Sequence, residues 1–420
     1  MVSKREPARA ERSAEQAVPE GYDVLVLDAS LKQSLAGVRA LGRAGLRVAA
    51  GESVTQFDSA VPLPAFRSRY CHRSVTLPDL VTSTPAFASA VIEFVRENSP
   101  RAVMPTGDLT ISVLRPYRQQ LADLGCFLAL APEPALEIAN DKDRTLATAR
   151  ELGIPYPRSI NVSNIAGIDL AAAEFGYPFV LKPTISWVGS SEERLVPVDV
   201  ASRDEAAEFM TRILGAGSGL LAQEWVPGRR EGVSLFIARD EVIAACGHIA
   251  HRTSPPLGGA SVVRESLTPP ADTLDASVRL AKAIGLQGPC EVEFRRDAAG
   301  RALLMEVNAR LAGTIENAVQ SGVDLPLMIW RWATDQDNEP VAGHRTGVRT
   351  RWLHGDLRWL LQNWKRTGRA DSVSRLASIG IFLAEFGKSA HYDYFDHRDV
   401  RPFLAELRYT LHVLVKFGRS

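Results

Sequence analysis

The segment that most constrains the fold is 290–310, CEVEFRRDAAGRALLMEVNAR, where apolar and polar side chains alternate on both sides of a turn signal. Alternation with a period of two predicts a β-hairpin with one buried face. With DAAG (297–300) as an even-length turn, one side of this hairpin is entirely apolar, and a slip of one residue would split that side between the two faces. The expected cross-strand pairs are Cys290 with Val307, Val292 with Met305, and Phe294 with Leu303.

The other side of the hairpin carries Glu291, Glu293, Glu306 and Asn308. In this register Glu293 and Glu306 are diagonal neighbours, about 7 Å apart. Two carboxylates at that separation, with an amide oxygen beside them, can hold Mg²⁺, which prefers hard oxygen ligands. A solvated strand face is the alternative, because glutamate is usually exposed. The Asn308-Ala309-Arg310 run that follows favours the metal site.

Two lysines occupy positions where a cation is costly without a nearby anion. Lys182 lies in the apolar strand run YPFVLKPT (177–184), where a buried ammonium needs a partner. Lys142 opens the helix predicted for 140–153, which has an Asn cap, and the helix dipole disfavours a cation there. A nucleotide phosphate would explain both positions. A snorkelling Lys182 and a simply exposed Lys142 are the alternatives.

A chain bend is predicted within 223–235, QEWVPGRREGVSL, where a strand ends in Glu-aromatic-aliphatic-Pro-Gly. Backbone groups at such an edge can bind adenine through its N6 and N1 atoms. Glu231 is placed to bind a ribose diol. Taken alone, the stretch is also compatible with an ordinary loop.

In combination, these motifs resemble the ATP-grasp superfamily over about 105–330. The runs NDKDRT, YPFVLKP, QEWVPGRREGVS, EVEF and MEVNAR occur in the order and spacing of that family. The likeness is closest to its carbamoyl-phosphate-synthetase-like ligases and carboxylate–amine ligases. It implies an ADP-forming enzyme that binds ATP and Mg²⁺, usually as two ions, with Mn²⁺ as a possible replacement.

The resemblance also implies roles for individual residues. The expected ATP contacts are Lys142, Lys182, Gln223, Glu224, Trp225, Val226 and Glu231, of which the two lysines contact phosphates, 224–226 form the adenine hinge and Glu231 binds the ribose. The expected metal ligands are Glu293, Glu306 and Asn308. Arg310 and Lys182 would serve catalysis, with Arg310 facing the acyl phosphate or the substrate carboxylate. Segment 184–191, TISWVGSS, stands where the family has a glycine-rich loop, but here Gly189 is its single glycine.

The segment HRTSPPLGGASVVRES (251–266) combines positive charge with a turn of small residues. In relatives of this kind it is a loop near the acceptor substrate, where arginines suit a carboxylate or an acyl phosphate. The expected substrate-loop residues are Arg252, Gly258, Gly259, Ser261 and Arg264. A plain surface loop is the alternative.

Four regions are expected along the chain. Residues 1–20 are polar and predict a disordered tail, and 21–135 predict a Rossmann-like domain because strand, helix and strand follow one another from 23 to 53. Residues 136–335 would form the ATP-grasp domain, and 336–420 a mainly helical C-terminal region. The expected fold class is α/β and α+β: a Rossmann-like pre-ATP-grasp domain, a two-subdomain ATP-grasp fold and a C-terminal helical region.

The composition argues against several functional classes. Among 420 residues, 49 Lys and Arg balance 49 Asp and Glu, so neither nucleic acid nor a membrane is expected as a partner. The four cysteines form no CxxC pair, which argues against a zinc site or a disulfide framework. No apolar run reaches the roughly 18 residues of a transmembrane helix, and 1–20 lack the apolar core of a signal peptide. A cytoplasmic protein is expected, with homo-oligomerisation left open.

The expected chemistry joins a small-molecule carboxylate to a small-molecule amine. ATP would phosphorylate the carboxylate and the amine would attack the acyl phosphate, so no covalent nucleophile is needed from the protein. A carboxylase or phosphotransferase on the same scaffold, and a non-catalytic ATP-binding module, are the alternatives. The joint presence of Glu293, Glu306, Asn308 and Arg310 argues against the non-catalytic module.

Overall fold

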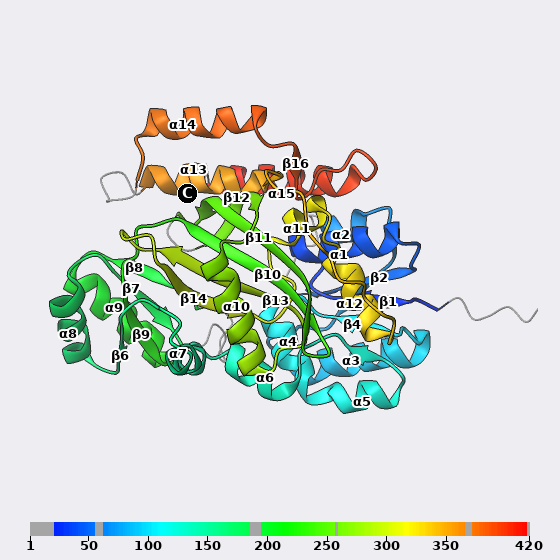
Figure 1. Cartoon of the computed structure of the whole chain (residues 1–420). Helices are drawn as coiled ribbons and strands as arrows, with labels where there is room; N and C mark the ends of the chain where they lie inside the picture. The colour runs from blue at the N-terminus through cyan, green and yellow to red at the C-terminus, as the bar shows by residue number, and fades with distance from the viewer. Residues whose placement is uncertain (1–20, 55–61, 185–194, 257–258, 366–371, 418–420) are drawn as a thin grey trace, which may run out of the picture.

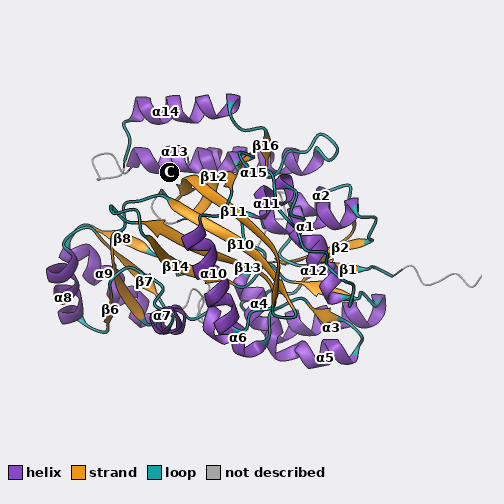
Figure 2. Cartoon of the chain, viewed as in Figure 1, coloured by secondary structure: helices purple, strands orange, loops and turns teal. Residues whose placement is uncertain are grey.

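Three β-sheets with helices on their faces organise the chain (Figure 1). The computed structural model describes residues 21–54, 62–184, 195–256, 259–365 and 372–417. Figure 2 shows the strands in the interior and the helices around them. Parallel and antiparallel sheets occur together, which confirms the expected mixed α/β and α+β class.

The N-terminal sheet is parallel throughout, with the order β3-β2-β1-β4-β5. Its strands are β1 (Val24–Val26), β2 (Val48–Ser53), β3 (Cys71–Leu77), β4 (Ala102–Met104) and β5 (Phe127–Leu128). The helices are α1 (Lys32–Arg43), α2 (Pro64–Arg67), α3 (Thr84–Asn98), α4 (Asp108–Leu114) and α5 (Arg118–Asp123). The predicted strand–helix–strand unit at 23–53 is confirmed. Because the strand order reverses between β1 and β4, a crevice is expected at their carboxyl ends.

A four-stranded antiparallel sheet follows, with the order β6-β9-β7-β8. It contains β6 (Ser159–Val162), β7 (Phe179–Pro183), β8 (Val198–Val200) and β9 (Leu220–Glu224), and α8 (Ile165–Phe175) and α9 (Arg203–Gly215) pack on one face. The helices α6 (Glu133–Ala139) and α7 (Lys142–Glu151) precede it. The expected Asn cap of α7 is wrong: the Asp141 carboxylate accepts from the amides of Asp143 and Arg144 at 2.9 and 3.1 Å.

The largest sheet has seven strands in the order β14-β13-β10-β11-β12-β15-β16. They are β10 (Arg230–Ala238), β11 (Glu241–Ser254), β12 (Ala260–Leu267), β13 (Gly288–Arg296), β14 (Ala302–Asn308), β15 (Arg349–Arg351) and β16 (His391–Tyr392). The predicted hairpin at Arg239-Asp240 is confirmed, and both residues have the positive φ of a two-residue hairpin turn, 52° and 63°. Helix α10 (Ala271–Ile284) packs on one face, while α11 (Ile315–Ser321) and α12 (Leu325–Ala333) pack near α1.

The β13–β14 hairpin keeps the predicted faces on β13, but on β14 the apolar face carries Leu304 in place of Leu303, and the predicted register is wrong. Val292 pairs with Val307 and Phe294 with Leu304, so the expected pairs are offset by two and one residues. The register shifts between Glu293 and Phe294, which leaves Met305 in a bulge. The loop spans 297–301, one residue more than expected. An extra residue in the turn and one in the bulge together bring Glu293 directly opposite Glu306.

The C-terminal segment contributes helices and also two strands to the large sheet. Its helices are α13 (Leu353–Lys365), α14 (Arg375–Ala384) and α15 (Arg401–Phe417). Strand β15 pairs antiparallel with β12, and β16 pairs parallel with β15. This segment therefore completes one edge of the sheet rather than standing apart from it.

A buried arginine connects the first and last parts of the chain. Arg39 of α1 is 1% exposed, and its Nε donates to the Asp399 carboxylate at 3.0 Å. The same guanidinium donates to the carbonyls of Asp393, Tyr394 and Asp399 at 2.8–3.0 Å. Asp399 also accepts from Ser68 Oγ at 2.7 Å. Such a charge needs all of these partners, because water cannot replace them.

We expect Asp399→Ala to lower the free energy of unfolding by about 3–5 kcal/mol, because it leaves the Arg39 charge buried and unpaired. Urea denaturation of the purified variant measures this loss. Asp396→Ala is the matched control, since Asp396 meets Arg43 at 3.3 Å near the surface and its loss should cost less than about 1 kcal/mol. Equal losses in the two variants would contradict the role given to Arg39.

Candidate functional site

Two carboxylates face each other where β13 and β14 pair. Glu293 lies directly opposite Glu306, and the Asn308 amide nitrogen is 3.5 Å from a Glu293 oxygen. Val292 and Phe294, the alternate residues of β13, pack in the core beside α10, so the carboxylates leave the sheet on its other face. The structure thus brings together the three residues expected to hold metal.

Four cations surround this pair, each from a different part of the chain: Lys142, Lys182, Arg230 and Arg310. Burial alone would raise the pKa of Glu306, but these cations hold it below its ordinary value. Burial raises the pKa of Glu293, with Arg230 opposing the shift and Glu306 adding to it. Burial therefore makes Glu293 the harder of the two carboxylates to ionise, and Arg230 is the cation that opposes this effect. A further cation at this point would favour ionisation of both.

Arg230 belongs to this site, although no pattern in the sequence singled it out. Its guanidinium forms an ion pair with Glu293 and donates to the Gly259 carbonyl. Gly259 in turn lies so close to Ser254 that a Cβ would be 1.9 Å from the Ser254 carbonyl oxygen. Only glycine fits there, so the predicted small-residue turn has a steric basis.

Both lysines expected at the ATP phosphates lie near the carboxylates. Lys182 projects from β7, where burial lowers the pKa of its ammonium to about 8 and Glu306 opposes the shift. Lys142 is the first residue of α7 and acts electrostatically on both Glu306 and Lys182. An anion placed between these lysines would raise the pKa of Lys182 again and favour its charged form.

The residues of the expected adenine hinge lie where β9 ends. Gln223 is buried and donates to Ser159 Oγ at 3.1 Å. The Glu224 carboxylate accepts from the Arg158 amide at 2.9 Å and from Arg158 Nε at 2.7 Å. The Glu224 side chain is therefore held by β6, which leaves its role at the hinge to the backbone.

Arg295 closes this hinge and was not expected from the sequence. Its guanidinium lies 5.3 Å from the centre of the Trp225 ring and donates to the Val226 carbonyl at 2.7 Å. Arg295 is on the same face of β13 as Glu293, by alternation. It therefore ties the end of the four-stranded sheet to the carboxylate face of the large sheet.

Arg310 reaches the N-terminal sheet. Its Nη2 donates to Asp108 at 3.1 Å and to the Asn308 side-chain oxygen at 3.1 Å, and its Nε also meets Asp108. Asp108 begins α4, directly after β4 and beside the expected crevice between β1 and β4. The crevice of the N-terminal sheet therefore opens next to the predicted catalytic arginine.

A second layer lies beneath the carboxylates. Glu291 accepts from Thr314 Oγ1, and its carboxylate is 3.4 Å from Ser234 Oγ and 3.8 Å from His248 Nδ1. His248 is buried, and this burial lowers its pKa to about 3. The imidazole is therefore neutral at pH 7. A Cβ on Gly232 would lie 2.2 Å from the His248 ring, so the two strands meet closely here.

The structure does not bring Glu231 to this site. Glu231 pairs with Phe294 across the sheet, so its side chain leaves on the face opposite Glu293. There its carboxylate accepts from Arg296 Nε at 2.9 Å, and Arg296 also pairs with Asp272 at 2.8 Å. This placement disagrees with the expected ribose contact. The sequence could not reveal it, because an acidic residue carries no sign of which face of the sheet its side chain will occupy.

The arginines of the expected substrate loop are also engaged elsewhere. Arg252 pairs with Asp356 at 2.7 Å and with Glu385 at 3.2 Å. Arg264 is fully buried and pairs with Asp393, and its Nη1 donates to the Ser261 carbonyl at 3.1 Å. Both arginines hold the C-terminal segment to the sheet. Gly258 and 185–191 lie outside the described residues.

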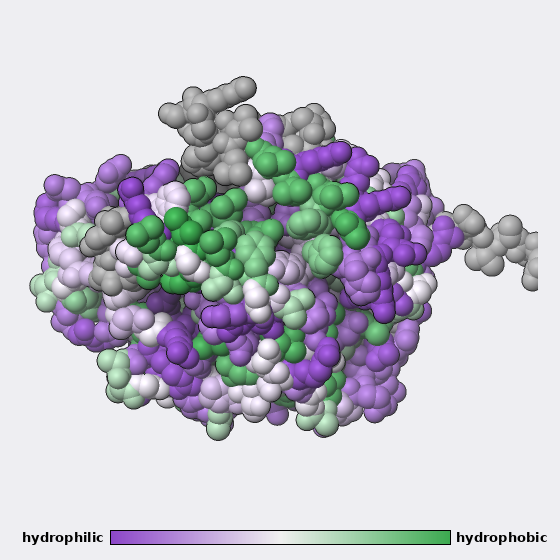
Figure 3. Space-filling model, turned by 90° about the horizontal axis from the view of Figure 1, so that it is seen from above, coloured by the Kyte–Doolittle hydropathy of each residue, from purple (hydrophilic) through white to green (hydrophobic). Residues whose placement is uncertain are grey.

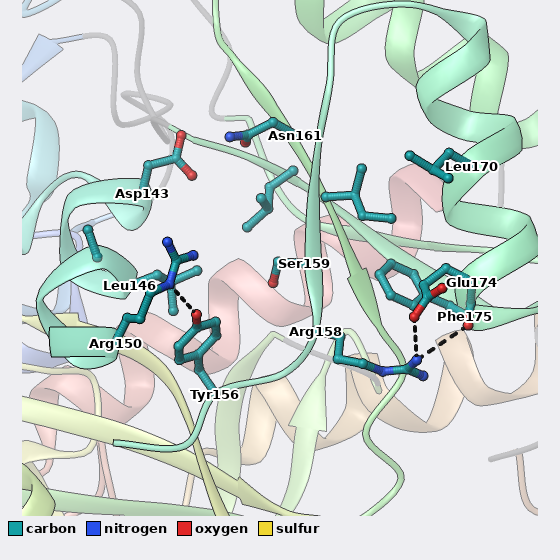
Figure 4. Close-up of a pocket in the computed structure, with 13 residues that line it drawn as sticks. Asp143, Leu146, Arg150, Tyr156, Arg158, Ser159, Asn161, Leu170, Glu174 and Phe175 are labelled. Atoms are coloured by element: carbon teal, nitrogen blue, oxygen red, sulfur yellow. Dashed lines mark hydrogen bonds and ion pairs between the residues drawn. The ribbon is translucent and has the colours of Figure 1, made fainter. Parts of the chain in front are cut away.

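A pocket lies between α7 and the four-stranded sheet. This pocket of about 790 Å³ is bordered by α7, β6 and the end of α8. Figure 4 shows Asp143 and Asn161 at one end, with the Arg150–Tyr156 and Arg158–Glu174 pairs at the other. None of the residues expected to bind ATP lines it.

The side chains available to bind a metal are few in the described part of the chain. Among the described residues, no group of three or more His, Cys, Asp and Glu side chains could hold a metal ion. A metal at Glu293 and Glu306 would therefore need Asn308 and oxygen atoms from a substrate.

Within the described parts of the chain, no helix combines the length and apolar character needed to span a membrane.

Part of the chain matches a known protein family. Residues 221–355 match the family described as "ATP-grasp in the biosynthetic pathway with Ter operon". A D-alanine–D-alanine ligase from Ectopseudomonas mendocina is 27% identical over 190 residues, covering 41% of this chain and 56% of the ligase. The chain therefore spans about half the length of that relative.

Two solved structures have the same fold. A biotin carboxylase–β,γ-ATP complex from Campylobacter jejuni matches with a TM-score of 0.60 and 15% identity, covering 78% of this chain and 74% of the other. An L-amino acid ligase from Bacillus licheniformis matches with a TM-score of 0.57 and 18% identity, covering 77% and 79%.

The neutral state of His248 predicts a pH dependence of stability. Its folded pKa lies below the unfolded value of about 6.5, so the unfolded chain takes up the proton first and stability is lost as the pH falls from about 6.5 towards 3. Between pH 7 and pH 5 this histidine should account for a loss of about 2 kcal/mol.

Urea denaturation at both pH values tests this, since His248→Gln should lose less stability on acidification than the wild type. The control is His397→Gln, because the His397 side chain is 79% exposed and its removal should leave the wild-type difference in place. An identical pH dependence in wild type and His248→Gln would refute the assignment.

Proposed function

Because the chain is a member of the ATP-grasp superfamily, we propose that it is an ADP-forming ligase that activates a carboxylate with ATP and joins it to an amine. The observation that carries the proposal is the opposed pair of Glu293 and Glu306, with Arg230 paired to Glu293 and four cations that lower the pKa of Glu306. Phosphoryl transfer needs such an arrangement, because its catalysis consists mainly of positioning and charge neutralisation. The similarity to a D-alanine–D-alanine ligase and to an L-amino acid ligase supports the same reaction type.

The donor set fits Mg²⁺ that is bound together with a nucleotide. Mg²⁺ is typically held by one or two carboxylates plus substrate phosphates, and Glu293, Glu306 and Asn308 offer two carboxylates and an amide oxygen. Burial, with a smaller contribution from Glu306, raises the pKa of Glu293, and a cation bound at this point would favour its charged form. When bound, Mg²⁺ or Mn²⁺, as one or two ions, would neutralise charge that develops on the phosphoryl oxygens.

The nucleotide would lie between the four-stranded sheet and the carboxylate face of the large sheet. The backbone of 224–226 would contact adenine, with Arg295 holding Trp225 and Val226 in place. Lys142 and Lys182 would bind the phosphates. Because burial lowers the pKa of Lys182, a phosphate oxygen beside it would both gain a hydrogen bond and favour the charged ammonium.

In the first step, an oxygen of the substrate carboxylate attacks the γ-phosphorus, the bond to the bridging oxygen breaks, and ADP leaves. In the second step, the amine attacks the carbonyl carbon of the acyl phosphate and inorganic phosphate leaves. Arg310 is placed to bind the carboxylate oxygens as charge moves onto the phosphoryl group. Asp108 orients its planar fork.

A carboxylase would use the same first step on bicarbonate, and the fold it shares with biotin carboxylase makes this the second candidate. The ligase is favoured because a D-alanine–D-alanine ligase is similar in sequence, while the similarity to biotin carboxylase is one of fold. ADP release with amino acids, with bicarbonate, and with neither separates the two functions.

We expect Glu306→Gln to lower the ADP-forming kcat by about a hundredfold or more, because it removes one of the two opposed carboxylates. Glu231→Gln is a matched control. On the face opposite the site, its removal should leave the KM for ATP within about twofold of wild type. A Glu306→Gln variant with wild-type turnover would overturn the metal assignment. A KM raised tenfold or more in Glu231→Gln would restore the ribose role that the structure does not support.

We expect hydroxylamine to intercept the acyl phosphate. With the correct carboxylate, ATP and Mg²⁺, a hydroxamate should form even when the amine substrate is left out. Arg310→Ala should slow hydroxamate formation by roughly ten- to a hundredfold, since a charge-assisted contact is worth about 1.5–3 kcal/mol. Arg310→Lys should recover only part of the rate. ADP release that never yields hydroxamate would rule out the ligase and favour transfer of the phosphoryl group elsewhere.

A further inference from the structure

Helix α14 attaches to the protein mainly through polar contacts, together with Phe382, which packs half-buried against the cluster of Val262, Trp359 and Leu360. Ser378 accepts from Trp364 Nε1 at 2.9 Å, and the Phe382 carbonyl accepts from Arg351 at 2.9 Å. Just beyond the helix, Glu385 is buried between Arg252 and Arg349, at 3.2 and 3.4 Å. A surface helix normally buries its apolar face and exposes its polar one. Here most of the large apolar side chains of α14 are exposed instead.

The outward side of α14 is apolar along its whole length. Leu376 is 83% exposed and Leu383 is 58% exposed, and their spacing places them with the exposed Ile379 on one side of the helix. Between Arg375 and Glu385 the sequence contains no charged residue. Monomeric proteins rarely leave a large continuous apolar surface without a function for it.

Helix α15 adds a second apolar stripe. Val400, Leu404, Leu407 and Leu411 are all exposed, and their spacing of four, three and four residues places them on one side of a helix. The face seen in Figure 3, which is the α13–α15 end of the molecule viewed from above, shows hydrophobic side chains gathered across it. Two helices therefore present apolar side chains to solvent at the same end of the protein.

The charge exposed around these helices has one sign. Within the described residues 353–365 and 372–412, every Lys and Arg side chain is exposed: Arg358, Lys365, Arg375, Lys388, Arg398, Arg401 and Arg408. Every Asp and Glu in the same ranges is buried or half-buried: Asp356, Glu385, Asp393, Asp396, Asp399 and Glu406. The neutral net charge of the whole chain hides this local excess of positive charge.

We propose that this surface, formed by α14, α15 and the basic residues around them, docks on an anionic lipid surface. Helices that lie in a membrane interface combine an apolar face with Lys and Arg at its border. Each basic side chain near anionic headgroups raises the affinity for the membrane about fivefold. The expectation that the protein has no membrane partner, drawn from net charge, is replaced by this proposal.

A second copy of the chain fits this surface less well. In a two-fold dimer each copy presents the same patch to the other, so the arginines that border α14 and α15 would face one another. Opposed like charges disfavour such an interface. A lipid surface supplies both the apolar medium and the opposite charge.

The test is flotation of the purified full-length chain with vesicles. We expect at least about tenfold tighter binding to phosphatidylcholine vesicles with one third phosphatidylserine than to phosphatidylcholine alone, with binding weakened by salt. Replacing Leu376 and Leu383 together by glutamate should lower this binding at least tenfold. Because both side chains are exposed, the variant should unfold at the wild-type temperature. Arg401→Gln with Arg408→Gln should weaken binding to the anionic vesicles and leave binding to neutral ones unchanged.

Leu170→Glu is the matched control, because Leu170 is 57% exposed on α8, in the four-stranded sheet unit. It should float like the wild type. Equal loss in Leu170→Glu, or no flotation of the wild-type chain, would overturn the proposal. A concentration-dependent dimer in analytical ultracentrifugation that the α14 double variant abolishes would also overturn it and assign the surface to a second copy.

Discussion

The repulsion between the carboxylates of the buried Glu293 and the half-buried Glu306 is the constraint on which the rest of the site depends. Glu293 and Glu306 face each other on paired strands, and they are tolerable together only because cations surround them. Those cations come from α7, β7, β10 and the segment after β14. The four-stranded sheet, the large sheet and the N-terminal sheet must therefore be held at fixed positions for the pair to be balanced. Arg295 and the Arg310–Asp108 pair provide two of the connections.

Other buried ions hold the ends of the chain together behind the site. Lys32 of α1 meets Asp393 at 3.2 Å and donates to the Ser261 carbonyl at 3.1 Å, and Arg264 meets the same aspartate. With the Arg39–Asp399 contact, these ions fasten the segment around 393–399 to both the N-terminal unit and β12. Buried ion pairs contribute little net stability but are costly to break. They are better suited to fixing one arrangement of the three sheets than to adding stability.

The fold class and the carboxylate pair could be predicted from the sequence, because both depend on periodic patterns. The apolar side of the 290–310 hairpin was predicted correctly for its first strand, while the register and the positions of Leu303 and Met305 were not, since a longer turn and a bulge at Met305 leave no mark in the alternation. Arg230 and Arg295 were missed because an arginine next to a turn has no periodic signal. Glu231 and Arg252 were given ligand roles, but a charged residue in sequence does not reveal whether its partner is a ligand or another side chain. Strand β15 was missed because it is three residues long and largely charged.

The polar attachment of α14 has a thermodynamic consequence. Glu385, below the helix, binds Arg252 of β11, and β11 also carries His248 next to Glu291. Coupling between two sites is reciprocal in equilibrium. Suppose that binding at the outer face of α14 alters the contact between Glu385 and Arg252 and, through β11, changes the affinity of the carboxylate face for its ligand. That ligand must then change the affinity at α14 by the same factor. The helix would then be an effector site, because binding there and binding of substrate would each change the affinity of the other.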